Sequence, residues 1–133
     1  MSLDTHYTVT TKFKVSFNDI TDLLCCGLEG NIDHWAFYRV GFTPNPEELA
    51  EYVSGPYRGL PQYAIQHPDY VIIVVDKETL EEYRVTLGRL KLGLTDMALK
   101  YPGHFMNFIQ GDSDSETGDV FIQCCVFGDI IYG

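Results

Sequence analysis

The chain has 133 residues, a length typical of one domain and too short for two well-packed ones. Apolar residues make up 45% and charged residues 21%, which excludes a disordered tail, and no apolar run approaches the roughly 18 residues of a membrane-spanning helix. We therefore expect one soluble domain over residues 1–133 and no membrane partner.

The charge is strongly negative and is spread along the chain. Nineteen acidic and nine basic residues give a formal net charge of −10, and a field of that sign repels the phosphate backbone, so we expect no nucleic-acid partner. Apolar residues interrupt the acids every few positions, which argues against a DNA mimic. The first residues lack the basic and apolar segments of an export signal, so we expect a cytoplasmic protein.

The four cysteines form two adjacent pairs, at 25–26 and 124–125. Neither pair has the two-residue spacer of a zinc or redox motif. We expect the cysteines to serve as small apolar side chains at places where two helices approach closely. A metal shared between the pairs and an inter-helix disulfide are the alternatives.

The first third of the chain predicts a strand, a helix and a second strand. Residues 7–15 alternate apolar and polar side chains, typical of a strand with one buried face. Ser16 and Asp19 have the spacing of a helix cap, and apolar residues then recur every three or four positions over residues 17–29. The aromatic, β-prone run 34–42 predicts the second strand.

The middle segment, residues 43–67, holds four of the six prolines. It predicts an irregular connection with one short helix over residues 47–53, which Pro46 begins. Long irregular loops in compact domains are often functional, so this segment is where we expect a site or an interface.

The next residues predict a β-hairpin and a helix. Residues 70–75 and 80–85 flank a polar turn, and the first of these runs is apolar enough to be a central strand covered on both faces. Thr86 is a helix cap, and the helical spacing of apolar residues continues to Pro102.

The last segment predicts a buried helix. Ser113 and Glu116 match a capping box, and between residues 120 and 127 only Gln123 is polar. A buried strand is the alternative for this run. A helix that is apolar on nearly all sides needs cover from two directions, by the sheet and by another helix or a second subunit.

Together these elements predict an α+β fold. We expect an antiparallel sheet of about four strands with two or three helices packed on one face. The predicted order is strand, helix, strand, irregular middle, hairpin, helix, helix.

Two groups of residues near the ends form recognisable patterns. The first is DITDLL at 19–24, with Leu28-Glu29-Gly30 and Trp35, and the second is DSETGDVFIQ at 114–123, with FGDIIYG at 127–133. Together they resemble small proteins of unknown function that bacteriophages and prophages encode. The resemblance implies a phage or mobile-element origin, with the host cytoplasm as location, and carries no known activity.

No motif in the sequence fixes a reaction. The acidic run 112–119 fails as a calcium loop of the EF type, because Thr117 and Gln123 stand where glycine and glutamate are required. Helix capping explains these acids, with a weak divalent-ion site as the alternative. The histidines lack ligand spacing, and neither a nucleophile elbow nor a phosphate loop is present. We expect no catalytic residue, metal or cofactor, and an enzyme is the less favoured class.

Five residues are candidates for binding a small ligand. Trp35, with Glu29 and Asp33 nearby, stands at a helix-to-strand turn and would stack on a base or a sugar; packing against the first helix is its alternative role. Arg39 and Arg58 are candidate contacts for an anion.

The function that the sequence favours is non-catalytic. We expect a phage-type accessory protein that forms a homo-oligomer and contacts a host or phage protein. One reason is that the final apolar helix has more apolar perimeter than a small sheet covers. The other is that aromatic residues, which suit interfaces as well as cores, are frequent. The alternative is a module that binds a nucleotide-like molecule between the middle segment and Trp35.

Overall fold

A computed structural model describes residues 5–133. It confirms the α+β class. The elements over these residues are, in chain order, α1 (Phe17–Leu28), η1 (Ile32–His34), β1 (Ala36–Val40), α2 (Pro46–Tyr52), η2 (Gly55–Tyr57), η3 (Pro61–Tyr63), β2 (Ile72–Asp76), β3 (Glu82–Val85), α3 (Leu87–Lys100), α4 (Pro102–Ile109) and α5 (Ser115–Phe127).

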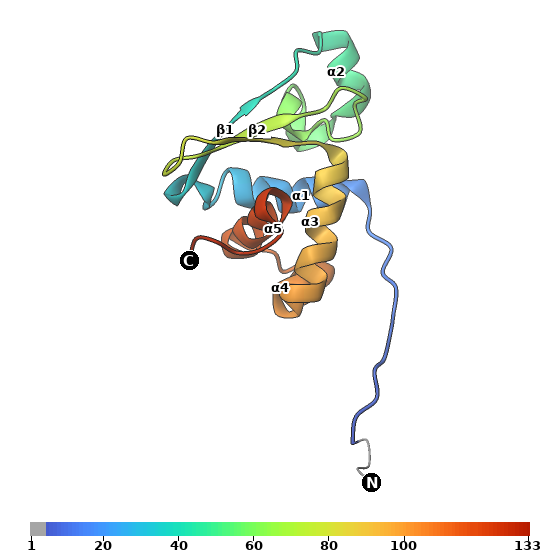
Figure 1. Cartoon of the computed structure of the whole chain (residues 1–133). Coiled ribbons are helices and arrows are strands. Elements are labelled where there is room, and N and C mark those ends of the chain that lie inside the picture. The colour runs from blue at the N-terminus through green and yellow to red at the C-terminus, as the bar shows by residue number, and fades with distance from the viewer. Residues whose placement is uncertain (1–4) are drawn as a thin grey trace.

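The three strands form one antiparallel sheet in the order β1-β2-β3. Tyr38 of β1 lies opposite Val74 of β2, which lies opposite Tyr83 of β3. Every residue of β2 is buried, as its unbroken apolar run predicts for a central strand. Figure 1 shows α1, α3, α4 and α5 on one side of the sheet and α2, with the middle segment, on the other.

The strand predicted over residues 7–15 does not form, so the sheet has three strands and not about four. Residues 5–15, which we call the arm, run extended but pair with no strand of the described chain. In Figure 1 the arm leaves the start of α1 and points away from the sheet. An alternating pattern shows that a segment could have one apolar face, but a strand also needs a neighbouring strand to complete its backbone hydrogen bonds, and the pattern does not indicate one.

The prediction of two or three helices is too low, because the described residues contain five α-helices. Helix α4 is the main omission. Pro102 ends the helical pattern of α3, as predicted, but it also occupies the first turn of α4, where a proline costs no hydrogen bond. Tyr101 is therefore both the C-cap of α3 and the N-cap of α4.

The final segment is the helix α5, and it is buried on all sides. All ten residues from Thr117 to Val126 are buried. Its N-cap is Asp114, whose side chain accepts a hydrogen bond of 2.8 Å from the Thr117 amide, and not Ser113 as the capping-box pattern predicts.

The cover of α5 comes from this chain's own helices, chiefly α1 and α3. Helices α1 and α5 cross at two glycines: a Cβ atom on Gly27 would lie only 2.6 Å from the Gly118 carbonyl oxygen. The apolar perimeter of α5 is therefore satisfied within one chain. The excess apolar perimeter of this helix over what a small sheet covers is therefore no argument for self-association, because α1 and α3 supply the cover.

Cys125 lies at a close helix contact, as the sequence predicts for the cysteines, and Cys124 beside it is also buried, whereas Cys25 and Cys26 are partly exposed. All four are free. A Cβ atom on Gly93 of α3 would lie 2.8 Å from the Cα of Cys125, so these two helices meet closely at that cysteine. Burial raises the pKa of the Cys124 thiol to about 12 and that of Cys125 well above its ordinary value, which makes both thiols poor nucleophiles.

Among residues 5–133, no helix combines the length and the apolar character that crossing a bilayer requires.

Candidate functional site

A buried carboxylate on α5 lies at the centre of a network of hydrogen bonds. Asp119 is 6% exposed. Its Oδ1 accepts a hydrogen bond of 2.7 Å from the indole Nε1 of Trp35, and its Oδ2 lies 3.0 Å from Nε2 of His34. The short helix η1 and the residue after it thus bring two ring nitrogens to one carboxylate, which offsets much of the cost of burying its charge.

Gln123, one turn further along α5, fastens the C-terminal tail to the helix. Its Oε1 accepts hydrogen bonds of 2.8 Å from the Ile131 amide and 2.9 Å from the Tyr132 amide. Its Nε2 donates to the Tyr132 carbonyl at 2.9 Å and to Asp119 at 3.3 Å. The single polar residue in the apolar run is therefore fully used within the fold.

The tail in turn covers Trp35. The Tyr132 ring stacks on the indole, with ring centres 5.6 Å apart and planes 16° from parallel, and its hydroxyl donates to Oδ2 of Asp76 at 2.6 Å. Phe127 packs against the same indole at 5.4 Å. Trp35 is 2% exposed, so in this conformation its ring packs in the core and presents no open face to a ligand.

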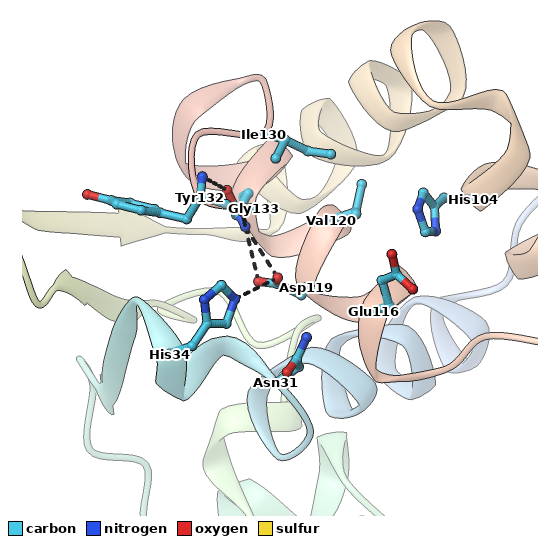
Figure 2. Close-up of a pocket in the computed structure, with 10 residues that line it drawn as sticks. Asn31, His34, His104, Glu116, Asp119, Val120, Ile130, Tyr132 and Gly133 are labelled. Atoms are coloured by element: carbon cyan, nitrogen blue, oxygen red, sulfur yellow. Dashed lines mark hydrogen bonds and ion pairs between the residues drawn. The ribbon is translucent and has the colours of Figure 1, made fainter.

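A cavity of about 390 Å³ lies beside this network. Figure 2 shows its polar lining: His34 from η1, Glu116 and Asp119 from α5, and His104 from α4, with Asn31 below them. The His104 ring is held by the Thr117 hydroxyl, which lies 3.0 Å from its Nδ1.

The lining sets the kind of ligand that this cavity would accept. Hydrogen-bonding groups converge on it from two helices and a turn, which is typical of small-molecule sites. The carboxylates of Glu116 and Asp119 favour a neutral or cationic molecule over an anion. Among residues 5–133, no three side chains of the ligand-forming types are grouped so that they could hold a metal ion.

A second candidate surface joins the arm to α3 and α4. Phe13 meets Phe105 of α4 edge to face, with ring centres 5.5 Å apart. An open groove of about 650 Å³ runs between the arm and the two helices, and its lining is largely apolar. Beyond Phe13 the arm is exposed: Tyr7 is 89% and Val9 75% accessible.

The arm also differs from the rest of the chain in its backbone and its charge. Residues 5–15 make no backbone hydrogen bond to the described chain. They include Lys12 and Lys14 and no acidic residue. The chain has a formal charge of −10 and the arm contributes +2, which leaves −12 on the other residues.

Three of the five predicted ligand contacts lie around η1. The carboxylate of Glu29 accepts a hydrogen bond of 2.7 Å from the Tyr63 hydroxyl, so it ties the middle segment to α1. The backbone carbonyl of Asp33 accepts a hydrogen bond from the Lys77 ammonium. Trp35 belongs to the buried network described above.

The two predicted arginines lie elsewhere. Arg39 is on the outer face of the sheet, where it pairs with Glu82 at 2.7 Å. Arg58 lines a different, shallow pocket with Pro44 and Pro46. The structure therefore does not gather the five predicted residues in one pocket.

In comparisons with known proteins, no protein-family model, curated protein or solved structure matches the chain. The function has to be inferred from the geometry.

Proposed function

We propose that the protein is a non-catalytic accessory protein of phage type, which acts in the host cytoplasm by self-association and by contact with other proteins. The observation that carries this proposal is the arm. Its side chains alternate like those of a strand, Tyr7 and Val9 are exposed, and its backbone is unpaired within the described chain.

Such a segment is well suited to bind another protein. An extended chain with free N–H and C=O groups pairs readily with a sheet edge, and contiguous exposed apolar groups mark interaction surfaces. The groove beside it adds Leu99, 76% exposed, and Met106, 40% exposed, to the same surface. The arm and groove thus supply a reason for self-association that is independent of α5.

The groups that come nearest to a catalytic arrangement support a non-catalytic role. The Thr117 hydroxyl pairs with His104, but Thr117 is fully buried and out of reach of a substrate. Asp119 already accepts hydrogen bonds from Trp35 and Gln123 and lies against His34, so its carboxylate is engaged within the fold. These contacts hold the side chains in place, and around Thr117 and Asp119 they leave no exposed hydroxyl group beside a base.

Light scattering on the full chain tests the proposal. We expect a mass that is a multiple of 15.1 kDa at micromolar protein and a monomer when Tyr7→Ser and Val9→Ser remove the exposed apolar side chains of the arm. Thr8→Ser, on the opposite side of the arm, is the matched control and should leave the mass unchanged. A wild-type chain that stays at 15.1 kDa at 100 micromolar or more would contradict the proposal.

The polar cavity favours a second candidate function, the binding of a small ligand. The site differs from the one that the sequence suggested, since it lies beside α5 and not between the middle segment and Trp35. Its acids favour a nucleoside or an amine over a nucleotide. A thermal-shift screen with nucleosides, nucleotides and polyamines tests this, because a ligand at a thousand times its Kd stabilises the fold by about 4 kcal/mol. Any shift should disappear in Glu116→Gln, and no shift with any compound would eliminate this candidate.

A further inference from the structure

We propose that residues 5–12 of one copy add as a fourth strand to the free edge of β3 in a second copy, and that the second copy returns the same contact. This inference rests on the proposed function and deepens it, because it names the partner of the arm and the surface that receives it. The four-stranded sheet that the sequence predicts would then be completed between two chains.

The outer edge of β3 has backbone groups available for such a strand. The Asp76 amide donates to the Glu81 carbonyl at 3.0 Å, so these two residues form a hydrogen-bonded pair. Hydrogen-bonded and non-bonded pairs alternate along an antiparallel ladder, so Glu82 and Arg84 of β3 direct their N–H and C=O groups away from β2. Neither residue makes another backbone hydrogen bond within residues 5–133.

The other edge of the sheet is less accessible, because η3 of the middle segment packs beside β1. The arm also cannot reach β3 of its own chain in the conformation seen, since it points away from the sheet in Figure 1 while Phe13 holds its base against α4. An arm that pairs with the open edge of β3 therefore has to come from another copy.

The side chains of the arm match both faces of this edge. In a strand, Tyr7, Val9 and Thr11 point to one side and Thr8, Thr10 and Lys12 to the other. On the helix side of β3, the half-buried rings of Tyr83 and Phe127 contact each other, with centres 5.2 Å apart, and the first set would cover them. On the outer side, Glu82, which pairs with Arg39, is half exposed and would lie on the same face as Lys12.

Charge favours a second copy as the occupant. The arm carries +2 and the remaining residues −12, so the arm of one chain is attracted to the body of another, whereas two bodies without arms repel each other. A reciprocal exchange makes the interface two-fold symmetric and closed, which limits the assembly to a dimer.

Two proline substitutions test strand addition on the full-length chain. Successive N–H groups of a strand point in opposite directions, and a proline is tolerated only where the N–H faces solvent. Of Thr10→Pro and Thr11→Pro, each of which replaces a threonine, one should therefore weaken the dimer Kd at least tenfold and the other less than threefold. Both positions are exposed, so the far-ultraviolet circular dichroism and the Tm of the monomer should remain those of the wild type.

Hydrogen exchange supplies the second measurement. The amides of Glu82 and Arg84 should exchange at least tenfold more slowly in the dimer than in the diluted monomer. A wild-type chain that never dimerises would overturn both this inference and the proposed function. A dimer that responds equally to the two prolines, with the Glu82 and Arg84 amides unprotected, would overturn strand addition alone and point to the groove on α3 and α4.

Discussion

The crossing of α1 and α5 makes a quantitative prediction for Gly118→Ala. A Cβ atom on Gly118 would lie 2.6 Å from the carbonyl carbon of Cys26 and 2.8 Å from the Cα of Gly27. Both are backbone atoms, so no side chain can rotate away and the helices have to separate. Overpacking of this kind costs roughly 3 kcal/mol at the upper end, and the better helix propensity of alanine returns about 1 kcal/mol. We expect a net loss of about 2 kcal/mol.

Gly88→Ala is the matched control on α3. The nearest atom to its added Cβ would be the Thr86 hydroxyl oxygen, at 3.7 Å, so the methyl group fits and stability should rise by up to about 1 kcal/mol. Urea denaturation followed by circular dichroism measures both, and Gly118→Ala should also lower the Tm by roughly 6 °C. A Gly118→Ala protein as stable as the wild type would refute the close crossing of these helices.

Two further predictions concern the β2–β3 hairpin. Leu80 is 69% exposed and adopts a φ of +63°, a backbone conformation that favours glycine. Leu80→Gly should therefore raise the free energy of unfolding by about 1 kcal/mol in the same denaturation assay. A loss of stability would contradict the turn geometry. Burial tends to raise the pKa of Asp76, but hydrogen bonds from Tyr132 and from backbone amides outweigh it and hold the pKa below its ordinary value of 3.8. The ionised carboxylate therefore stabilises the fold above pH 3.8, and this stabilisation is lost as the pH falls through the pKa of the folded state. We expect Asp76→Asn to be less stable than the wild type at pH 7 and to lose less stability between pH 5 and 2. Parallel profiles of stability against pH for the two proteins would contradict this.

Local signals in the sequence predicted most of the elements on the helix side of the sheet. Ser16 and Thr86 cap α1 and α3 as expected, and each hydroxyl oxygen accepts a hydrogen bond from the amide three residues later. These signals succeed because a cap and its helix lie within a few residues of each other. Pro102 shows their limit, since the same residue ends one helix pattern and begins the next helix.

The polar cavity could not be predicted in the same way. Asp119 lies 85 residues from His34 and 84 from Trp35, so only the packing of α5 brings them together. The sequence marked Trp35 for its chemistry, yet the Tyr132 ring that covers it comes from the other end of the chain. Gln123 was visible as the one polar residue in an apolar run, which is a usable sign of a buried hydrogen-bonding role.

Contacts between the arm and another copy can be observed directly by nuclear magnetic resonance. In a mixed sample, one half of the chains carries ¹³C-labelled valine methyl groups and the other half is unlabelled. We expect isotope-filtered nuclear Overhauser contacts between the Val9 methyl protons of a labelled chain and the Tyr83 ring of an unlabelled one. Contacts from Val9 that arise only within a single chain, at concentrations where the wild type is fully associated, would contradict strand addition between copies.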